Sequence, residues 1–231
     1  MNTLLETKGL SRNFGGLKAV SDLDFRLESG EIRAIIGPNG AGKTTFVSLI
    51  SGRISPSAGT ITFAGENITR LPAFKRVRRG IAYTFQITSI YSNLTVAENI
   101  TLAKQRVNAK SNSDYLERVG IADRAAQIAG TLSYGHQRLL EVAMGLALHP
   151  KLLILDEPTQ GLSDAEIANF TELVKDLAKQ ATVLLIEHNM PVVMNLAHRI
   201  TVLDRGMVLA EGTPAEIRAN ELVQNAYLGK A

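Results

Sequence analysis

Residues 37–45, which read "GPNGAGKTT", combine the residue types that hold a chain of phosphates. Glycines let backbone N–H groups point inward, and a helix N-terminus adds further donors, so such a loop favours an anion. The Lys43 ammonium can reach β- and γ-phosphates, and the Thr44 hydroxyl can ligate Mg²⁺. An apolar run precedes the loop and a helical pattern follows it, which disfavours a glycine-rich turn without a ligand. We therefore predict a phosphate cradle formed by Gly37, Pro38, Asn39, Gly40, Ala41, Gly42, Lys43, Thr44 and Thr45.

Two carboxylates end another apolar run, "LLILDE" at residues 152–157. In an open parallel sheet, ligands bind beyond the carboxyl ends of the strands, so we expect Asp156 and Glu157 near the cradle. Asp156 can hold Mg²⁺ directly or through water, and Glu157 can orient a water molecule or accept its proton. The alternative is that one acid merely caps the turn before Pro158.

Two further polar residues follow predicted strands. His188 comes after "TVLLIE", and its imidazole can hydrogen-bond a phosphate oxygen or the attacking water. Gln86 ends "IAYTF" and can contact the metal ion or the water. A lone histidine is more often structural, and a solvent-facing loop explains Gln86 equally well, so both assignments depend on the other motifs. With them, the predicted catalytic set is Lys43, Gln86, Glu157 and His188.

The elements that must position these residues alternate along the chain. Apolar strand patterns occur at 32–36, 60–64, 81–85, 152–156, 182–186, 200–204 and 207–211, and residues 4–10 and 19–27 alternate in polarity. The continuous patterns favour parallel strands buried on both faces, and the alternating ones favour an antiparallel addition. Helical patterns lie between the strands, so we predict an α/β layered core.

Residues 88–150 contain helical patterns and no convincing strand. We therefore predict a helical subdomain at 88–150, inserted between two parts of the core, 1–87 and 151–231, with residues 108–114 as its internal loop. Pairs typical of a capping box mark three helix starts: Thr95 with Glu98, Ser163 with Glu166, and Thr213 with Glu216.

The composition is that of a globular protein, because 45% of the 231 residues are hydrophobic and 20% are charged. The net charge of +3 is too small to argue for nucleic-acid binding, and we interpret the basic run at 75–80, "KRVRRG", as a solvated helix face. The absence of cysteine excludes disulfides and zinc–thiolate sites. Without a signal pattern or a bilayer-spanning run, the chain is expected to be soluble and intracellular, with any membrane role supplied by a partner.

Together these motifs resemble the nucleotide-binding subunits of ATP-binding cassette (ABC) transporters over nearly the whole chain. The pieces that carry the resemblance occur in the order Phe14, "GPNGAGKTT", Gln86, "LSYGHQR", "LLILDEP", "GLSD" and His188. The resemblance implies a P-loop NTPase core with an N-terminal antiparallel portion and an inserted helical subdomain, and ATP and Mg²⁺ as ligands. It also implies that Phe14 stacks on adenine, with Val20 nearby, and that Gln86 joins Thr44 and Asp156 at the metal.

The stretch at 132–138, "LSYGHQR", resembles the family's signature motif L-S-G-G-Q, which lies at a helix N-terminus. The resemblance implies that Ser133 and Gly135 contact the γ-phosphate bound by a second cassette subunit, so that ATP lies between two chains. A hydroxyl and free amides at the positive end of a helix suit an anion. Tyr134 and His136 depart from the motif, and Ser163 stands where the family often has aspartate.

Finer features, among them "FGGLKAV", "YTFQ" and the ending "EGTPAEIRANELVQNAYLG", are most similar to cassettes of branched-chain amino-acid importers or of related urea and amide importers. This resemblance implies integral membrane permease partners contacting residues 87–100, and indirectly a solute-binding protein, with no nucleic-acid partner. It also implies a peripheral place on the cytoplasmic face of the inner membrane. The second cassette is either another copy or a sister chain.

The alternatives to an importer subunit are an exporter ATPase like that of lipopolysaccharide export, a soluble cassette ATPase acting on DNA or ribosomes, and a non-hydrolysing scaffold.

Overall fold

The fold was analysed in a computed structural model that describes residues 2–84, 89–105 and 115–228. The predicted loop at 108–114 lies outside the described residues. The strands are β1 (Thr3–Phe14), β2 (Leu17–Glu28), β3 (Ile32–Ile36), β4 (Ala58–Phe63), β5 (Glu66–Asn67), β6 (Ile81–Thr84), β7 (Leu152–Asp156), β8 (Thr182–Ile186), β9 (Arg199–Asp204) and β10 (Met207–Gly212). The α-helices are α1 (Lys43–Ser51), α2 (Ala73–Arg78), α3 (Val96–Gln105), α4 (Tyr115–Arg118), α5 (Tyr134–Ala147), α6 (Asp164–Leu177), α7 (Met190–Leu196), α8 (Pro214–Ala219) and α9 (Glu221–Leu228).

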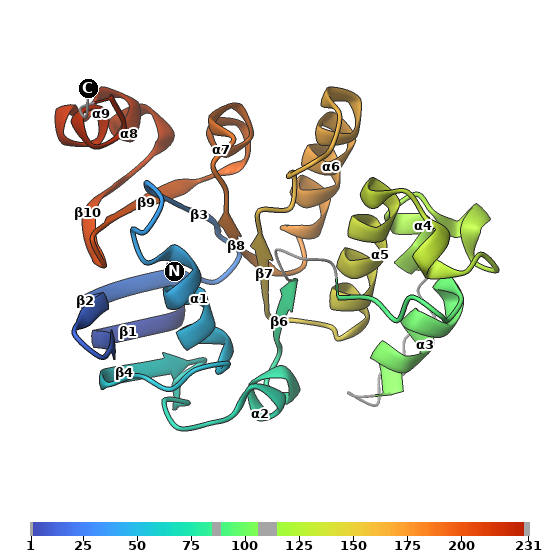
Figure 1. Cartoon of the computed structure of the whole chain (residues 1–231), viewed down its shortest axis with the longest axis horizontal. Helices are drawn as coiled ribbons and strands as arrows, with labels where there is room; N and C mark the ends of the chain where they lie inside the picture. The colour runs from blue at the N-terminus through green and yellow to red at the C-terminus, as the bar shows by residue number, and fades with distance from the viewer. Residues whose placement is uncertain (1, 85–88, 106–114, 229–231) are drawn as a thin grey trace.

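The described strands form two sheets (Figure 1). In the larger sheet the order is β10-β9-β3-β8-β7-β6, and all of its pairs are parallel except β10 with β9. The smaller sheet has the order β2-β1-β4-β5, with antiparallel pairs throughout. The predicted α/β core with an antiparallel N-terminal portion is therefore confirmed.

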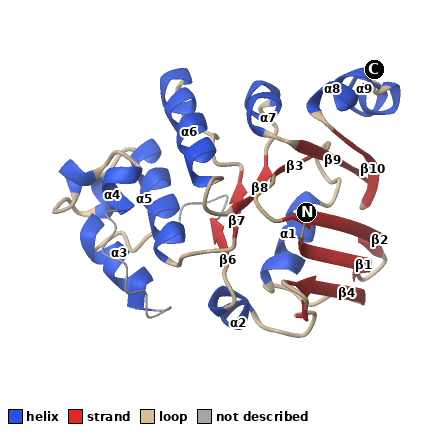
Figure 2. Cartoon of the chain, turned by 180° about the vertical axis from the view of Figure 1, so that it is seen from behind, coloured by secondary structure: helices blue, strands red, loops and turns tan. Residues whose placement is uncertain are grey.

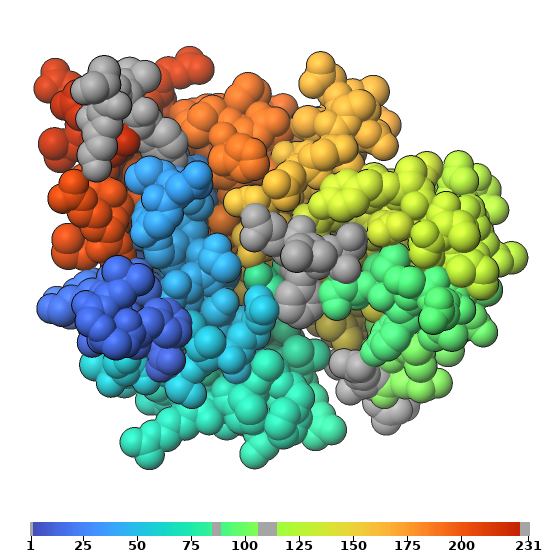
Figure 3. All heavy atoms as spheres, in the orientation of Figure 1, coloured from blue at the N-terminus to red at the C-terminus, as the bar shows by residue number. Residues whose placement is uncertain are grey.

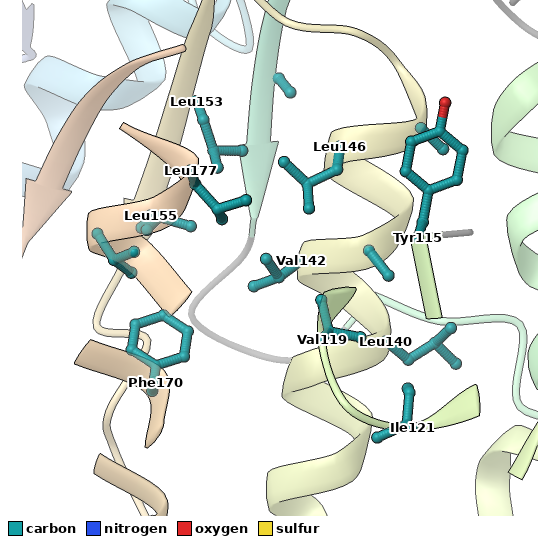
Figure 4. Close-up of a cluster of buried hydrophobic side chains, with 14 of the residues drawn as sticks. Tyr115, Val119, Ile121, Leu140, Val142, Leu146, Leu153, Leu155, Phe170 and Leu177 are labelled. Atoms are coloured by element: carbon teal, nitrogen blue, oxygen red, sulfur yellow. The ribbon is translucent and has the colours of Figure 1, made fainter. Parts of the chain in front are cut away.

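The parallel strands are buried on both faces, as their continuous apolar patterns predict. On β7, Leu153 and Leu155 pack into a cluster with helices α3 to α7, whereas Leu152 and Ile154 face the opposite side. Figure 4 shows Leu153 and Leu155 beside the side chains that α5 and α6 contribute to the first cluster. Side chains alternate along a strand, so this packing also fixes the face of the sheet on which the Asp156 side chain lies.

Helix α1 lies between the two sheets. Its buried residues Phe46, Val47, Leu49 and Ile50 share one cluster with residues of the antiparallel strands and with Ile35, Ile154, Leu184 and Ile186 of the parallel strands. The N-terminus of α1 is thereby held at the carboxyl end of β3, the strand that precedes it in the chain.

Helices α3, α4 and α5 gather on one side of the larger sheet (Figure 2). In Figure 3 the N-terminal strands (blue) and this helical group (green to yellow-green) occupy opposite sides of the molecule. The predicted capping boxes are confirmed at Ser163, Thr213 and Thr95, where the hydroxyl accepts from the backbone N–H three residues later and the glutamate accepts in return. No helix in the described part of the chain is both long and apolar enough to span a bilayer.

The interpretation of 75–80 as a solvated helix face is wrong for one residue. Arg76 is 1% exposed and donates to the carbonyl oxygens of Leu49 and Ile50 at 2.7 and 2.8 Å, and to those of Leu71 and Thr69 at 2.8 and 3.0 Å. The last carbonyls of a helix have no partner within it, so Arg76 closes the C-terminal end of α1. Burial lowers the pKa of Arg76 to about 10, which leaves its guanidinium charged near neutral pH.

The closure of α1 by Arg76 predicts a loss of stability in Arg76→Met. Methionine removes the guanidinium and leaves buried carbonyl groups without donors, which should lower the free energy of unfolding by about 2–4 kcal/mol. Urea denaturation followed by circular dichroism measures this. The matched control is Lys75→Met, because the Lys75 side chain is exposed on the same helix. Equal midpoints for the two variants would contradict the role of Arg76.

Candidate functional site

The loop between β3 and α1 has the backbone that the predicted phosphate cradle requires. Gly37 and Gly42 have φ angles of 154° and 99°, and a Cβ atom on them would overlap the carbonyl oxygens of Leu203 and Ala19. A side chain would therefore block the loop's approach to its neighbours at these positions. The loop is tied to the turn after β9 because the Gly206 N–H donates to the Ala41 carbonyl oxygen at 3.0 Å.

The N-terminus of α1 is prepared for an anion. Gly42 is the residue before the first helical turn and brings no side-chain cap, and the first turn contains no acidic residue. The amides of this turn have no carbonyl partner within the helix, so they are donors for a ligand. Thr44 is exposed at the same end. The loop thus fits a chain of phosphates by its backbone as well as by its sequence.

The structure brings Lys43 together with the carboxylates of β7. The Lys43 ammonium donates to the carbonyl oxygens of Gly37 and Pro38 at 2.6 and 3.1 Å. Burial lowers the pKa of Lys43, and the nearby charges of Glu157 and Asp156 oppose that shift. The cradle and the carboxylates, which lie more than 100 residues apart in the chain, therefore form one site.

Asp156 is the last residue of β7 and is 1% exposed. Its Oδ2 accepts a hydrogen bond of 2.6 Å from the Tyr83 hydroxyl of β6. Burial raises the pKa of Asp156, and the bond from Tyr83 opposes this. Burial, together with the Asp156 carboxylate, raises the pKa of Tyr83, so its hydroxyl stays protonated and remains a donor. A threonine hydroxyl such as that of Thr44 and a carboxylate such as that of Asp156 are both oxygen ligands of the kind that Mg²⁺ takes.

Glu157 continues the chain beyond β7 in an unusual conformation. Its φ angle is +47°, in the left-handed region that residues with a side chain rarely adopt. The Glu157 N–H donates to the Ile186 carbonyl oxygen of β8 at 2.8 Å, which holds the turn in place. Such conformations cluster at active sites, where the neighbouring structure enforces them. Pro158 follows directly, and the Glu157 carbonyl oxygen accepts from the Gln160 N–H at 3.2 Å, so a turn begins at this point.

Glu187 is a residue that the sequence analysis missed. It is 1% exposed, and its Oε1 accepts from the backbone N–H and the hydroxyl of Thr159. Its Oε2 accepts from the N–H groups of His188 and Asn189 at 2.8 and 2.9 Å. This carboxylate therefore joins the turn after Glu157 to the loop that carries His188. The one available signal was a glutamate ending an otherwise apolar strand, "TVLLIE".

His188 itself is presented to solvent, since its side chain is 62% exposed at the end of β8. The His188 backbone N–H donates to the Glu187 carboxylate, which fixes the position of the His188 backbone. The imidazole therefore lies at the same sheet edge as Glu157. Gln86, the other residue expected there, lies outside the described residues.

The signature stretch opens α5 as predicted. Ser133 is the N-cap residue, and its hydroxyl accepts from the His136 N–H at 3.3 Å and pairs with His136 Nδ1 at 2.7 Å. Gly135 is buried against the Glu166 carboxylate of α6, while Tyr134 is exposed beside Gly161. Ser133 is exposed at this positive end of the helix.

The two residues expected at the adenine behave differently. Phe14 ends β1 and is 46% exposed, with the Arg12 guanidinium 4.6 Å from its ring centroid. This rules out a core role for Phe14 and leaves its ring open to a base. Val20, in contrast, is fully buried in β2, and the structure does not present its side chain to a ligand.

A cavity of about 330 Å³, here called the subdomain cavity, lies between the core and the helical group. Arg53, Val77 and Tyr83 line it from the core side, and Tyr91 and Met144 from the helical side. Of the residues expected to contact a partner, Ile90 and Tyr91 line this cavity, whereas Val96 and Ile100 are buried in the helical group. Residues 87 and 88 lie outside the described part of the chain.

Known proteins with the same arrangement were found by sequence and by structure. The family model described as "ABC transporter" matches residues 20–160, and that described as "Branched-chain amino acid ATP-binding cassette transporter" matches residues 207–231. The high-affinity branched-chain amino acid transport ATP-binding protein BraF of Pseudomonas aeruginosa is 38% identical over 99% of this chain and 98% of BraF. The lipopolysaccharide export system ATP-binding protein LptB of Haemophilus influenzae is 32% identical over 99% of this chain and 98% of LptB. Among solved structures, an ATP-binding cassette of an ABC transporter in its ADP conformation has a TM-score of 0.89 at 26% identity, covering 100% of both chains.

The bonds of Glu187 predict that Glu187→Gln is destabilising although the two side chains have nearly the same shape. Both carboxylate oxygens accept hydrogen bonds, so the amide NH₂ must face donors whichever way it is turned. We expect the free energy of unfolding to fall by about 2–3 kcal/mol. Urea denaturation measures the change, with Glu172→Gln as the control because the Glu172 side chain is 72% exposed. Indistinguishable unfolding midpoints would show that Glu187 does not hold the two loops together.

Proposed function

The chain belongs to the ATP-binding subunits of ABC transporters, and from that premise we propose that it binds and hydrolyses ATP to power the import of branched-chain amino acids or related amides. The observation that carries the proposal is that β3 and β7 end at the same level of the sheet, which brings Lys43, Asp156 and Glu157 to one edge. A cassette that lacked one of these three residues would suit a non-hydrolysing scaffold. In this proposal Lys43 binds phosphate, Asp156 holds the metal and Glu157 is the base.

The phosphates of ATP occupy the loop at 37–45 in this proposal. The first-turn amides of α1 and the Lys43 ammonium bind the β- and γ-phosphates, for which the ammonium leaves the carbonyls of Gly37 and Pro38. Thr44 and Asp156 would hold Mg²⁺, which when bound neutralises charge on the phosphate oxygens. Gln86 is proposed as a further metal or water contact. Phe14 stacks on the adenine, an interaction that suits any planar base.

Glu157 is proposed as the group that prepares the attacking water. Its carboxylate accepts a hydrogen bond from the water and takes up the proton as the oxygen bonds to the γ-phosphorus. The His188 imidazole holds a γ-phosphate oxygen or the same water. Both residues are positioned through β8, Glu157 by its bond to Ile186 and His188 by its bond to Glu187.

The γ-phosphate is proposed to be shared with a second cassette subunit, either a copy of this chain or a sister chain. In support, Ser133 is exposed at the N-terminus of α5, on a different part of the chain from the loop at 37–45. The positive end of a helix suits an anion such as a partner's phosphate. Closure of the two chains around ATP, and reopening after hydrolysis, supplies the movement that a transporter uses.

The membrane partners are proposed to be integral permease subunits that insert a segment into the subdomain cavity. Ile90, Tyr91 and Met144 give the cavity an apolar wall of the kind that binds a partner's side chains. The core at 1–87 and 151–231 and the helical subdomain at 88–150 would move against each other at this cavity. The chain would then sit on the cytoplasmic face of the membrane, with a solute-binding protein on the opposite face.

The cargo is proposed from the C-terminal region. Residues 207–231 match the branched-chain amino acid family model, and this segment contributes β10, α8 and α9. An exporter function remains the second candidate, since LptB of Haemophilus influenzae is 32% identical over nearly the full chain.

Isolation of the intact membrane complex tests the choice between import and export. Permeases that copurify with a branched-chain amino-acid-binding protein support import, and lipopolysaccharide-export partners would support the alternative.

The role of Glu157 predicts that Glu157→Gln retains ATP binding but hydrolyses ATP about 100-fold more slowly or worse, because the amide cannot take a proton from water. The assay is phosphate release, with binding of a fluorescent ATP analogue measured in parallel. The control is Glu66→Gln, whose carboxylate is 63% exposed on β5. Rapid turnover by Glu157→Gln would remove Glu157 from the mechanism.

The shared site predicts that Ser133→Arg leaves nucleotide binding by the single chain intact but weakens ATP-driven pairing at least about tenfold. The bulky side chain fills the space that the partner's phosphate needs. Sedimentation velocity in the Glu157→Gln background measures pairing, both for the chain alone and for the transporter complex. Thr101→Arg is the control, because Thr101 lies on the exposed face of α3. Unimpaired pairing of Ser133→Arg would contradict the sharing of ATP between chains.

A further inference from the structure

Tyr83 occupies a position between the metal carboxylate and the subdomain cavity. Its backbone pairs with Ile154 on the neighbouring parallel strand β7, and Asp156 lies two residues beyond Ile154. Residues two apart on a strand point to the same face, so the Tyr83 side chain shares a face with Asp156 and reaches it diagonally across the strands. The register of β6 against β7 therefore dictates the 2.6 Å bond between the Tyr83 hydroxyl and Asp156 Oδ2.

The bond restrains a carboxylate that has little other freedom. Asp156 is 1% exposed, and its Oδ2 is bonded to the Tyr83 hydroxyl. A hydrogen bond to one oxygen of a metal-binding carboxylate fixes its orientation before the metal arrives. The short distance is that of a strong bond between a hydroxyl and a carboxylate.

The other side of Tyr83 faces the subdomain cavity. The ring forms part of the cavity wall, and the Arg53 guanidinium lies 5.4 Å from the ring centroid. Arg53 Nη1 also approaches the Tyr83 hydroxyl oxygen at 3.4 Å. One side chain thus contacts both the cavity and the carboxylate, and no second residue intervenes.

We propose that Tyr83 is a positioning residue for the magnesium site, which orients Asp156 and places the wall of the subdomain cavity one hydrogen bond from the carboxylate that would hold the metal. The inference rests on the proposed function, because it needs Asp156 to serve Mg²⁺. A segment seated in the cavity contacts the same ring that orients Asp156, so docking and metal binding act on one side chain. The specific consequence concerns nucleotide affinity. The Tyr83 hydroxyl should increase the gain in affinity that Mg²⁺ brings and should leave the affinity without metal unchanged.

The test is equilibrium binding of a fluorescent ATP analogue to Tyr83→Phe, in excess Mg²⁺ and in EDTA. In EDTA the dissociation constants of wild type and variant should agree within about twofold. The ratio of the two constants, which measures the gain from Mg²⁺, should fall about tenfold in the variant, the usual cost of removing a residue that supports a metal ligand. In ATPase assays the apparent Mg²⁺ constant should rise by a similar factor, with turnover at saturating Mg²⁺ largely retained.

Tyr91→Phe is the matched control, because Tyr91 lines the same cavity from the helical side and should keep the full gain from Mg²⁺. If Tyr83→Phe does not fold, Tyr83→His provides the test, since its ring N–H can replace part of the donor and should restore part of the gain. An unchanged gain from Mg²⁺ in a folded Tyr83 variant overturns the inference alone. A wild-type chain that gains nothing from Mg²⁺ would instead overturn the proposed magnesium site.

Discussion

The parallel register of β3, β8 and β7 is the constraint on which the site depends. Ile35 of β3 and Asp156 of β7 both pair with Ile186 of β8, so the chain leaves all three strands at the same level of the sheet. The cradle at 37–45, Glu157 and Glu187 follow directly. A slip of one residue between β7 and β8 would send Asp156 to the opposite face, because side chains alternate along a strand. The residues before Asp156 anchor β7 on both faces, Leu153 and Leu155 on one and Leu152 and Ile154 on the other.

The sheet edge that results is held in unfavourable conformations by its neighbours. Glu157 adopts a positive φ angle that the bond to Ile186 maintains, and Glu187 ties the following turn to the His188 loop. Helix α1 is fixed at both ends, by the cradle at its N-terminus and by the buried guanidinium of Arg76 at its C-terminus. Buried, fully bonded charges are costly unless their geometry is good, so these groups specify one arrangement of the edge as much as they stabilise it.

The sequence contained most of the framework. The runs at 32–36, 152–156 and 182–186 coincide with β3, β7 and β8, because continuous apolar patterns bounded by polar residues define buried strands well. The capping boxes were equally clear, since both partners lie within one helical turn. The proposed metal and phosphate residues could be named from the sequence because their spacing along the chain is itself the signal.

The residues that support the site could not be predicted in the same way. Tyr83, Arg76 and Glu187 act through partners that are distant in the chain: Tyr83 through Asp156, 73 residues away, and Arg76 through Leu49, 27 residues away. A basic run such as 75–80 is usually solvated, and only packing shows that one of its members is buried. Val20 was expected near a base because of resemblance, and the complete burial of its side chain could be seen only in the folded chain.

The central claim is that this sheet edge forms half of a site which a second cassette completes. A crystal or cryo-electron microscopy structure with a non-hydrolysable ATP analogue and Mg²⁺ tests it most directly. The account predicts a γ-phosphate held by Lys43 of one chain and by residues 133–135 of its partner. A γ-phosphate enclosed by a single chain, with residues 133–135 remote from any nucleotide, would contradict it.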